Sequence, residues 1–282
     1  MAELLLGKPV GDAISEKLTV RAAALKEKGV EPCLAIMRVG ERGDDISYET
    51  GAMKRCAAIG ITVKQFLLPA DADEEAILGT IDTINKDDSI HGCLMFRPLP
   101  DKAVEAKASA MLDPAKDVDC MTDGSLATVF KGKGEGYPPC TAQACIEILD
   151  NYGVDLAGKN VAVVGRSLVI GKPVSMLLQA KNATVTMCHT KTVDMAGICK
   201  KADIIVAAAG HIGTVTKDFV NENQYIIDVG INVNAEGKLC GDVAFDEVEP
   251  LVKAITPVPR GVGSVTTAVL AKHVIEAAEK KA

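Results

Sequence analysis

Hydrophobic positions along the chain follow two alternating patterns. Short runs rich in β-branched residues alternate with longer stretches in which apolar residues recur at helical spacing. This alternation is typical of a parallel sheet whose strands are joined by crossover helices. The first part of the chain contains three predicted strands, at residues 34–39, 62–68 and 93–96. They alternate with three predicted helices, at residues 10–28, 44–59 and 73–85, which together predict a small α/β domain.

The second half repeats the alternation after a helical stretch at residues 141–152. The predicted strands there cover residues 160–164, 183–187, 203–209, 225–230 and 254–258. A helix is expected at residues 172–181. Residues 122–139 are rich in Gly and Pro and show no periodicity, which favours an interdomain connection. The last amphipathic helix, 265–280, has no strand after it, so we expect it to pack back on the first domain.

Composition narrows the class of protein. The 282 residues are 48% hydrophobic, and 31 Lys and Arg against 38 Asp and Glu give a net charge of −7, which argues against a nucleic-acid partner. The N-terminus lacks the basic and apolar regions of a signal peptide, and no apolar run is long enough for a membrane helix, so we expect a cytoplasmic protein. The nine cysteines form no Cys-x-x-Cys pair, and we expect buried thiols and no metal site.

The clearest chemical signal is the glycine turn that follows the predicted strand 160–164. Gly165 would allow a sharp turn, and the backbone N–H groups from Arg166 and Ser167 to the start of the next helix would hold a pyrophosphate. The spacing from Gly165 to Gly171 differs from the usual Gly-x-Gly-x-x-Gly, so a plain strand-to-helix turn remains open at this point.

The next strand end indicates which dinucleotide would bind. An NAD site usually has Asp or Glu there to bind the ribose 2′-hydroxyl. This chain instead has hydroxyl and basic side chains, with Thr190 following His189 and no carboxylate among residues 188–192. Arg166 and Thr190 would favour the 2′-phosphate of NADP by charge and hydrogen bonding, so NADP is preferred over NAD.

Several segments, read together and in order, carry a family resemblance. They are Lys116-Asp-Val-Asp119, Pro139-Cys-Thr141, Gly165-Arg-Ser-x-x-Ile-Gly171-x-Pro173, Ala183-Thr-Val-Thr-x-Cys-His-Thr-Lys-Thr192, Asp228-Val-Gly-Ile-Asn232, Gly241-Asp-Val243 and Ile255-Thr-Pro-Val-Pro-x-Gly-Val-Gly263. Over essentially its whole length, the chain closely resembles the methylenetetrahydrofolate dehydrogenase/cyclohydrolase family.

The resemblance implies an α/β protein with two domains and a cleft between them. Residues 1–140, completed by the C-terminal helix 265–282, would form a folate-binding catalytic domain, and residues 141–264 an NADP-binding Rossmann domain. It also implies a homodimer. The family oxidises 5,10-methylenetetrahydrofolate to the methenyl form, and its bifunctional members then hydrolyse that product to 10-formyltetrahydrofolate.

The resemblance also assigns roles to individual residues. Tyr48 would stack on the folate, and Asp119 would hydrogen-bond the amino-pyrimidine edge of the pterin, so these two are the expected catalytic residues. Pro259 and Gly263, in the loop after the last strand, would lie close to the substrate. Ile231 would contact the nicotinamide end of the cofactor through its backbone.

Two departures from the family pattern carry a prediction. Bifunctional members have Lys four residues after the Tyr, and this chain has Ala52 there; the Gln that normally bonds that Lys is replaced by Phe96. Lys54 lies about 240° around a helix from Tyr48 and is a poor substitute. Because water attack needs proton transfer, we expect a dehydrogenase whose cyclohydrolase activity is lost or very weak, with a separate cyclohydrolase as a possible partner. The alternative is a working bifunctional enzyme.

Two other functions compete with this interpretation. A reductase of the shikimate dehydrogenase type also pairs a small α/β domain with an NADP-binding domain, but its catalytic Lys/Asp pair cannot be placed here. A dinucleotide sensor without turnover would have no need of Tyr48 and Asp119. Arg260 stands where the family commonly has Gly, and either the glutamate tail of the substrate or bulk water remains open as its neighbour.

Overall fold

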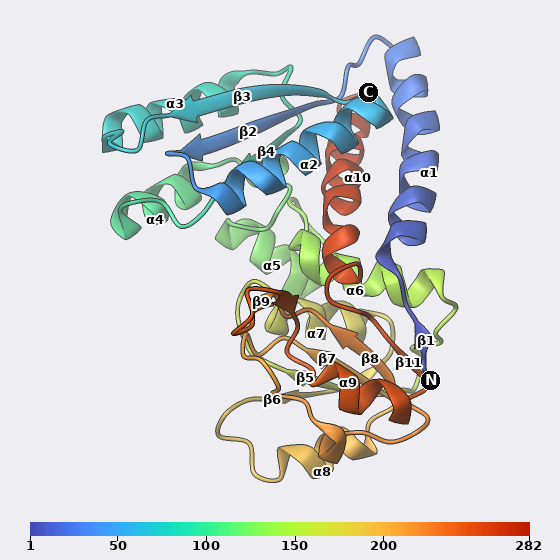
Figure 1. The fold of residues 1–282 in the computed structure, drawn as a ribbon. Helices are drawn as coiled ribbons and strands as arrows, with labels where there is room; N and C mark the ends of the chain where they lie inside the picture. The colour runs from blue at the N-terminus through green and yellow to red at the C-terminus, as the bar shows by residue number, and fades with distance from the viewer. The chain divides into compact units, whose positions relative to one another are not determined.

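The computed structural model describes all 282 residues, which form two compact units (Figure 1). The six-stranded unit comprises residues 1–11 and 141–266, and the three-stranded unit comprises residues 12–140 and 267–282. The α/β class is as predicted. We expected residues 1–11 in the same domain as the rest of residues 1–140. They belong instead to the six-stranded unit, because β1 (Glu3–Leu4) pairs in parallel with β11 (Ala254–Ile255) of its sheet.

The three-stranded unit is built on a parallel sheet with strand order β3-β2-β4. Its strands are β2 (Cys33–Val39), β3 (Thr62–Leu68) and β4 (Gly92–Met95). All seven residues of β2 are buried, as expected for the central strand of a parallel sheet; six are apolar and the seventh is Arg38. The helices are α1 (Gly7–Glu27, whose first turn belongs to the other unit), α2 (Gly43–Ile59), α3 (Glu74–Lys86), α4 (Lys102–Met111), α5 (Asp123–Lys131) and α10 (Thr266–Glu279).

The C-terminal helix α10 packs in the three-stranded unit, as its lone amphipathic pattern predicts. The imidazole of His273 lies 2.9 Å, through Nδ1, from the carbonyl oxygen of Val118. A Cβ atom at Gly92 of β4 would lie 3.1 Å from Val274 of α10, so the helix approaches the strand closely.

Helix α5 lies where we expected only a connection. Thr122 caps it by accepting the N–H of Ser125 at 3.0 Å, and Gly132 ends it with φ of 68°. The buried carboxylate of Asp117 holds the start of this segment by accepting the N–H groups of Met121 and Thr122, at 3.0 and 2.8 Å. A short helix fixed by its caps and by such contacts has little periodicity to detect in the sequence.

The six-stranded unit has one parallel sheet with strand order β1-β11-β8-β7-β5-β6. Its remaining strands are β5 (Asn160–Val164), β6 (Thr184–Cys188), β7 (Ile204–Ala207) and β8 (Tyr225–Asp228). Beside it lies a hairpin of β9 (Asn232–Val233) and β10 (Leu239–Cys240). The helices are α6 (Cys140–Asn151), α7 (Gly171–Ala180), α8 (Met195–Lys201) and α9 (Phe245–Val248). Short 3₁₀ turns complete the two units, at Pro114–Lys116, Lys217–Phe219, Glu249–Leu251 and Val262–Ser264.

The strand order of this sheet changes direction between β5 and β7. The chain runs from β5 outward to β6 and then crosses to β7 on the other side, followed by β8 and β11. In open parallel sheets, ligands bind in the crevice outside the carboxyl ends of the strands at such a point. The predicted strands 225–230 and 254–258 are shorter in the structure because their last residues leave the sheet and form loops at this edge.

The cysteines behave as small apolar residues. Eight of the nine are buried, all nine are free, and only Cys240 is partly exposed. Burial raises the pKa of the Cys56, Cys93 and Cys199 thiols to about 12. None of the helices is both long and apolar enough to cross a membrane.

Candidate functional site

The loop after β5 is folded tightly against the end of β7. Gly165 has φ of +134°, and a Cβ atom there would overlap the carbonyl oxygen of Ala208. A Cβ atom on Gly171, at the start of α7, would overlap the carbonyl oxygen of Gly165. Only glycine fits at both positions, so the backbone of the turn and the N-terminus of α7 are held close to the crevice.

The polar residues of this turn are arranged on its outer side. Arg166 is exposed, and no hydrogen bond or ion pair of its guanidinium group is found in the structure. Ser167 accepts the N–H of Ile170 through Oγ at 3.1 Å, which stabilises the turn and leaves its hydroxyl proton available. The geometry therefore fits the expected phosphate-binding turn, with Arg166 as its cation.

The neighbouring strand brings Thr190 to the same edge. The pairing of Val164 with Cys188 means that β5 and β6 end side by side. His189 has a local role, because its Nδ1 accepts the N–H of Lys191 at 3.1 Å. Thr190 is exposed, and no carboxylate replaces it at the strand end. Hydroxyl and basic side chains at this place fit a 2′-phosphate better than a bare ribose.

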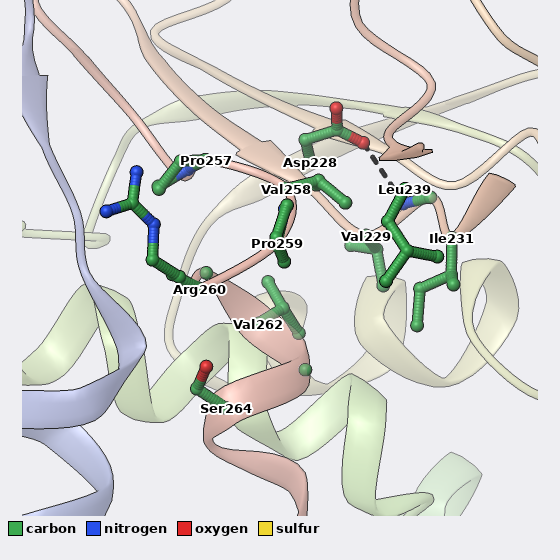
Figure 2. A pocket seen from close by; sticks show the side chains of 13 residues that line it. Asp228, Val229, Ile231, Leu239, Pro257, Val258, Pro259, Arg260, Val262 and Ser264 are labelled. Atoms are coloured by element: carbon green, nitrogen blue, oxygen red, sulfur yellow. Dashed lines mark hydrogen bonds between the residues drawn. The ribbon is translucent and has the colours of Figure 1, made fainter. Parts of the chain in front are cut away.

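Figure 2 shows a pocket formed by the loops that follow β8 and β11. Ile231, Pro259 and Gly263, three residues predicted from the family resemblance, all line it. Ile231 is 70% exposed, so its side chain is accessible at the pocket.

Arg260 has an unusual backbone conformation at the rim of this pocket. Its φ of 85° is one that glycine adopts without strain, in agreement with the glycine that the family commonly has there. Its carbonyl oxygen accepts the N–H of Gly7 at 2.8 Å. In Figure 2 its side chain extends beside Pro257, away from Ile231, so the guanidinium group does not fill the pocket.

In the three-stranded unit, Tyr48 and Phe96 contact each other. Their rings meet edge to face, with centroids 6.0 Å apart. Tyr48 comes from α2 and Phe96 directly follows β4, and both side chains are half-buried. Ala52 is fully buried and Lys54 is exposed, so Lys54 does not share the buried face of α2.

A buried ion pair holds α2 on its sheet. Arg38 of β2 donates through Nε to Glu49 at 2.8 Å, and Glu49 also accepts from the side-chain amide of Gln65 in β3. Arg38 donates in addition to the carbonyl oxygen of Gly40. Because Glu49 follows Tyr48 directly, this network fixes the turn of the helix that carries the tyrosine. The sequence motifs gave no indication of it.

Asp119 lies between the 3₁₀ turn Pro114–Lys116 and α5, in the same unit as Tyr48. Its carboxylate accepts the N–H of Cys140 at 2.9 Å. Burial raises the pKa of Asp119, and hydrogen bonding from Cys140 and, to a smaller extent, the positive charge of Arg97 oppose the rise. The first residue of this motif, Lys116, has a structural role: its ammonium group donates to three carbonyl oxygens at the end of α3, those of Ile84, Asn85 and Asp87.

The expected substrate residues are therefore divided between the units. Tyr48 and Asp119 belong to the three-stranded unit, and Pro259 and Gly263 belong to the six-stranded unit. The five expected cofactor residues, Gly165, Arg166, Ser167, Thr190 and Ile231, all lie in loops at the carboxyl edge of the six-stranded sheet.

Comparisons with known proteins agree with this geometry. Residues 5–119 match the catalytic-domain model of the tetrahydrofolate dehydrogenase/cyclohydrolase family, and residues 139–282 match its NAD(P)-binding domain. The bifunctional protein FolD of Carboxydothermus hydrogenoformans is 51% identical over 281 residues, which cover 99% of this chain and 98% of that protein.

Solved structures with similar folds include two members of the family. The bifunctional FolD enzyme of Campylobacter jejuni has a TM-score of 0.94 and 35% identity, with full coverage of both chains. The Trypanosoma brucei methylenetetrahydrofolate dehydrogenase-cyclohydrolase, solved with NADP cofactor and an inhibitor, has a TM-score of 0.91 and 33% identity, and the match covers 99% of this chain and 98% of that one.

These relatives correct one prediction. From Ala52 and Phe96 we expected a dehydrogenase without effective cyclohydrolase activity, and a separate cyclohydrolase as partner. The full-length relatives at 48–51% identity are named as bifunctional proteins, which contradicts that expectation. The inference assumed that proton transfer to or from the attacking water depends on one lysine. The substitutions at positions 52 and 96 carry less weight than similarity over nearly the whole chain. The chain belongs to the tetrahydrofolate dehydrogenase/cyclohydrolase family.

Proposed function

We propose that this protein is a bifunctional enzyme. It oxidises 5,10-methylenetetrahydrofolate with NADP and hydrolyses the methenyl product to 10-formyltetrahydrofolate. The observation that carries the proposal is the full-length similarity to relatives named bifunctional FolD, together with family matches over both halves of the chain. A structural relative that was solved with NADP supports the choice of cofactor.

In this proposal the six-stranded unit binds NADP. The turn from Gly165 to the start of α7 holds the pyrophosphate through backbone N–H groups, because both glycines bring the main chain close to the crevice. Arg166 and Thr190 bind the 2′-phosphate. The backbone at Ile231 contacts the nicotinamide end, which accepts the hydride when the cofactor is bound.

The three-stranded unit binds the folate. The half-buried ring of Tyr48 stacks on the substrate, and Asp119 hydrogen-bonds the amino-pyrimidine edge of the pterin. Pro259 and Gly263 contribute from the loop after β11. Hydride transfer chiefly requires that the two rings be held face to face, because the folate nitrogens supply the electrons that stabilise the product cation.

Hydrolysis adds a requirement for proton transfer. Water that attacks the methenyl carbon must lose a proton, and Ala52 and Phe96 offer no titratable group for this. Asp119 binds the amino-pyrimidine edge in this proposal, on the opposite side of the pterin from the methenyl carbon, so its carboxylate does not take this proton.

Separate assays of the two reactions test the proposal. Purified enzyme with methylenetetrahydrofolate should reduce NADP faster than NAD, and enzyme given methenyltetrahydrofolate alone should produce 10-formyltetrahydrofolate faster than buffer does. Absence of NADP reduction would refute the dehydrogenase assignment, and hydrolysis no faster than buffer would refute the second activity.

We also propose that the chain forms a homodimer. Light scattering after size-exclusion chromatography should then give twice the chain mass of 29.5 kDa. A mass equal to that of one chain at micromolar concentration would contradict this proposal.

A further inference from the structure

Two buried aspartates lie behind the loops that form the carboxyl edge of the six-stranded sheet. Asp228 ends β8 and is 2% exposed, and Asp242, which follows β10, is 0% exposed. Both belong to motifs that the family resemblance marked, Asp228-Val-Gly-Ile-Asn232 and Gly241-Asp-Val243, without a role for either carboxylate. A buried carboxylate is costly unless it is hydrogen-bonded, so its partners indicate what it does.

Asp242 joins two loops that come from different strands. One carboxylate oxygen, Oδ2, accepts the N–H groups of Ala209 and Gly210, at 2.6 and 2.8 Å, in the loop after β7. The other, Oδ1, accepts from the side-chain amide of Asn232 at 2.9 Å, where the loop after β8 enters β9. The single side chain thereby fixes the distance between the two loops.

Asp228 in turn holds the segment that carries Asp242. Its carboxylate accepts the N–H groups of Gly230, Asp242 and Val243, at 3.0, 2.9 and 3.0 Å. A Cβ atom on Gly230 would overlap the carboxylate of Asp242, and one on Gly241 would overlap the carboxylate of Asp228. Each of the two glycines is thus required because a carboxylate lies where its side chain would be.

The position of Ile231 depends on this arrangement. It lies between Gly230, which Asp228 binds, and Asn232, which Asp242 binds, and its own side chain is 70% exposed in the pocket of Figure 2. Ala209 and Gly210 follow β7, whose end lies against the Gly165 turn. Asp242 therefore connects the side of the crevice beside the phosphate turn to the loop of Ile231.

We propose that Asp242 is a positioning residue for NADP: through Asn232, Ala209 and Gly210 it sets where the nicotinamide end lies relative to the phosphate turn. This rests on the proposed function, because it assumes that NADP occupies the crevice. The carboxylate itself is fully buried and would act through these contacts. Its loss should lower the efficiency with which NADP is used and leave the Michaelis constant for the folate nearly unchanged.

A reciprocal swap tests the proposal with substitutions that keep the shape of both side chains. Asn232→Asp places two carboxylates together, and we expect kcat/KM for NADP to fall about tenfold or more, since a repulsive or unpaired buried polar contact suffices for such a factor. Asp242→Asn added to that variant restores the pair in reverse, because the new amide donates to the new carboxylate and its oxygen still accepts from Ala209 and Gly210. The double variant should recover most of the loss.

The controls separate the possible failures. Asp246→Ala, an exposed aspartate of α9 nearby, should behave like wild type. Melting temperatures of all variants should stay within a few degrees of wild type, so that a kinetic change is not mere unfolding. If wild type neither binds nor reduces NADP, the proposed function fails. If wild type is active but Asn232→Asp retains full efficiency, or the double variant does not recover, the positioning role of Asp242 is refuted.

Discussion

The buried ion pair between Arg38 and Glu49 offers a sharp prediction about what holds α2 in place. The side chains are 9% and 5% exposed, so each charge depends on the other for compensation. Glu49→Ala removes the carboxylate and leaves the guanidinium group of Arg38 in the protein interior with only the carbonyl oxygen of Gly40. It also leaves the amide of Gln65 without its acceptor.

The magnitude follows from the burial of both partners. Breaking one side of a buried pair typically costs about 3–5 kcal/mol, because the remaining charge is uncompensated. This is a large fraction of the roughly 5–15 kcal/mol by which domains are stable. Replacing both charges with apolar residues of similar size, Arg38→Met with Glu49→Leu, should cost much less, since no charge is then left buried.

Urea unfolding followed by circular dichroism measures the effect, with Glu16→Ala on the exposed side of α1 as the control. We expect Glu49→Ala to lower the urea midpoint strongly and the double variant to recover most of the difference. Because Glu49 follows Tyr48, the Michaelis constant for methylenetetrahydrofolate should also rise in Glu49→Ala. An unfolding free energy of Glu49→Ala within about 1 kcal/mol of that of the control would refute the reasoning.

Further predictions concern the six-stranded unit. Gly165→Ala should abolish NADP binding, as measured by calorimetry, because the new methyl group overlaps the carbonyl oxygen of Ala208 at a φ of +134°. Arg166→Ala should raise the Michaelis constant for NADP about tenfold and leave that for NAD nearly unchanged, and equal effects on both would contradict 2′-phosphate binding. Burial raises the pKa of Asp228 from 3.8 to about 6, so its proton contributes stability that is complete below about pH 4 and is lost as the pH rises through 6. The melting temperature of Asp228→Asn should therefore decline less than that of wild type between pH 4 and 7, and parallel declines would contradict this. A thiol reagent should modify one cysteine, Cys240, in the native protein and nine after unfolding; rapid native modification of several would contradict the described burial.

The fold was predictable where hydrophobic spacing is regular. The strand at 160–164 and the strand at 62–68 have the same bounds in the structure, and α2 ends at Ile59 as predicted. Helix α5 was missed because caps at Thr122 and Gly132 define it more than periodicity does. Strand β1 was missed because two residues paired to a distant strand leave no local signal.

The candidate site was predictable to the extent that local motifs carry it. The glycine turn, Thr190 and the loop from Pro259 to Gly263 could be proposed from the sequence, because turns and strand ends leave signatures in neighbouring residues. Tertiary contacts leave none: the ties from Asp242 to Ala209 span 33 residues, and the pair of Arg38 and Glu49 joins a strand to a helix. The effect of Ala52 on function was misjudged because one helix position does not determine how a whole site handles a proton.

The most direct test of the central claim is a single reaction of purified enzyme with methylenetetrahydrofolate and NADP, in which reduced NADP, methenyltetrahydrofolate and 10-formyltetrahydrofolate are quantified over time. A bifunctional enzyme predicts that reduced NADP appears together with 10-formyltetrahydrofolate and that little methenyl product accumulates beyond what buffer hydrolysis allows. Methenyltetrahydrofolate that accumulates one for one with reduced NADP would contradict the account.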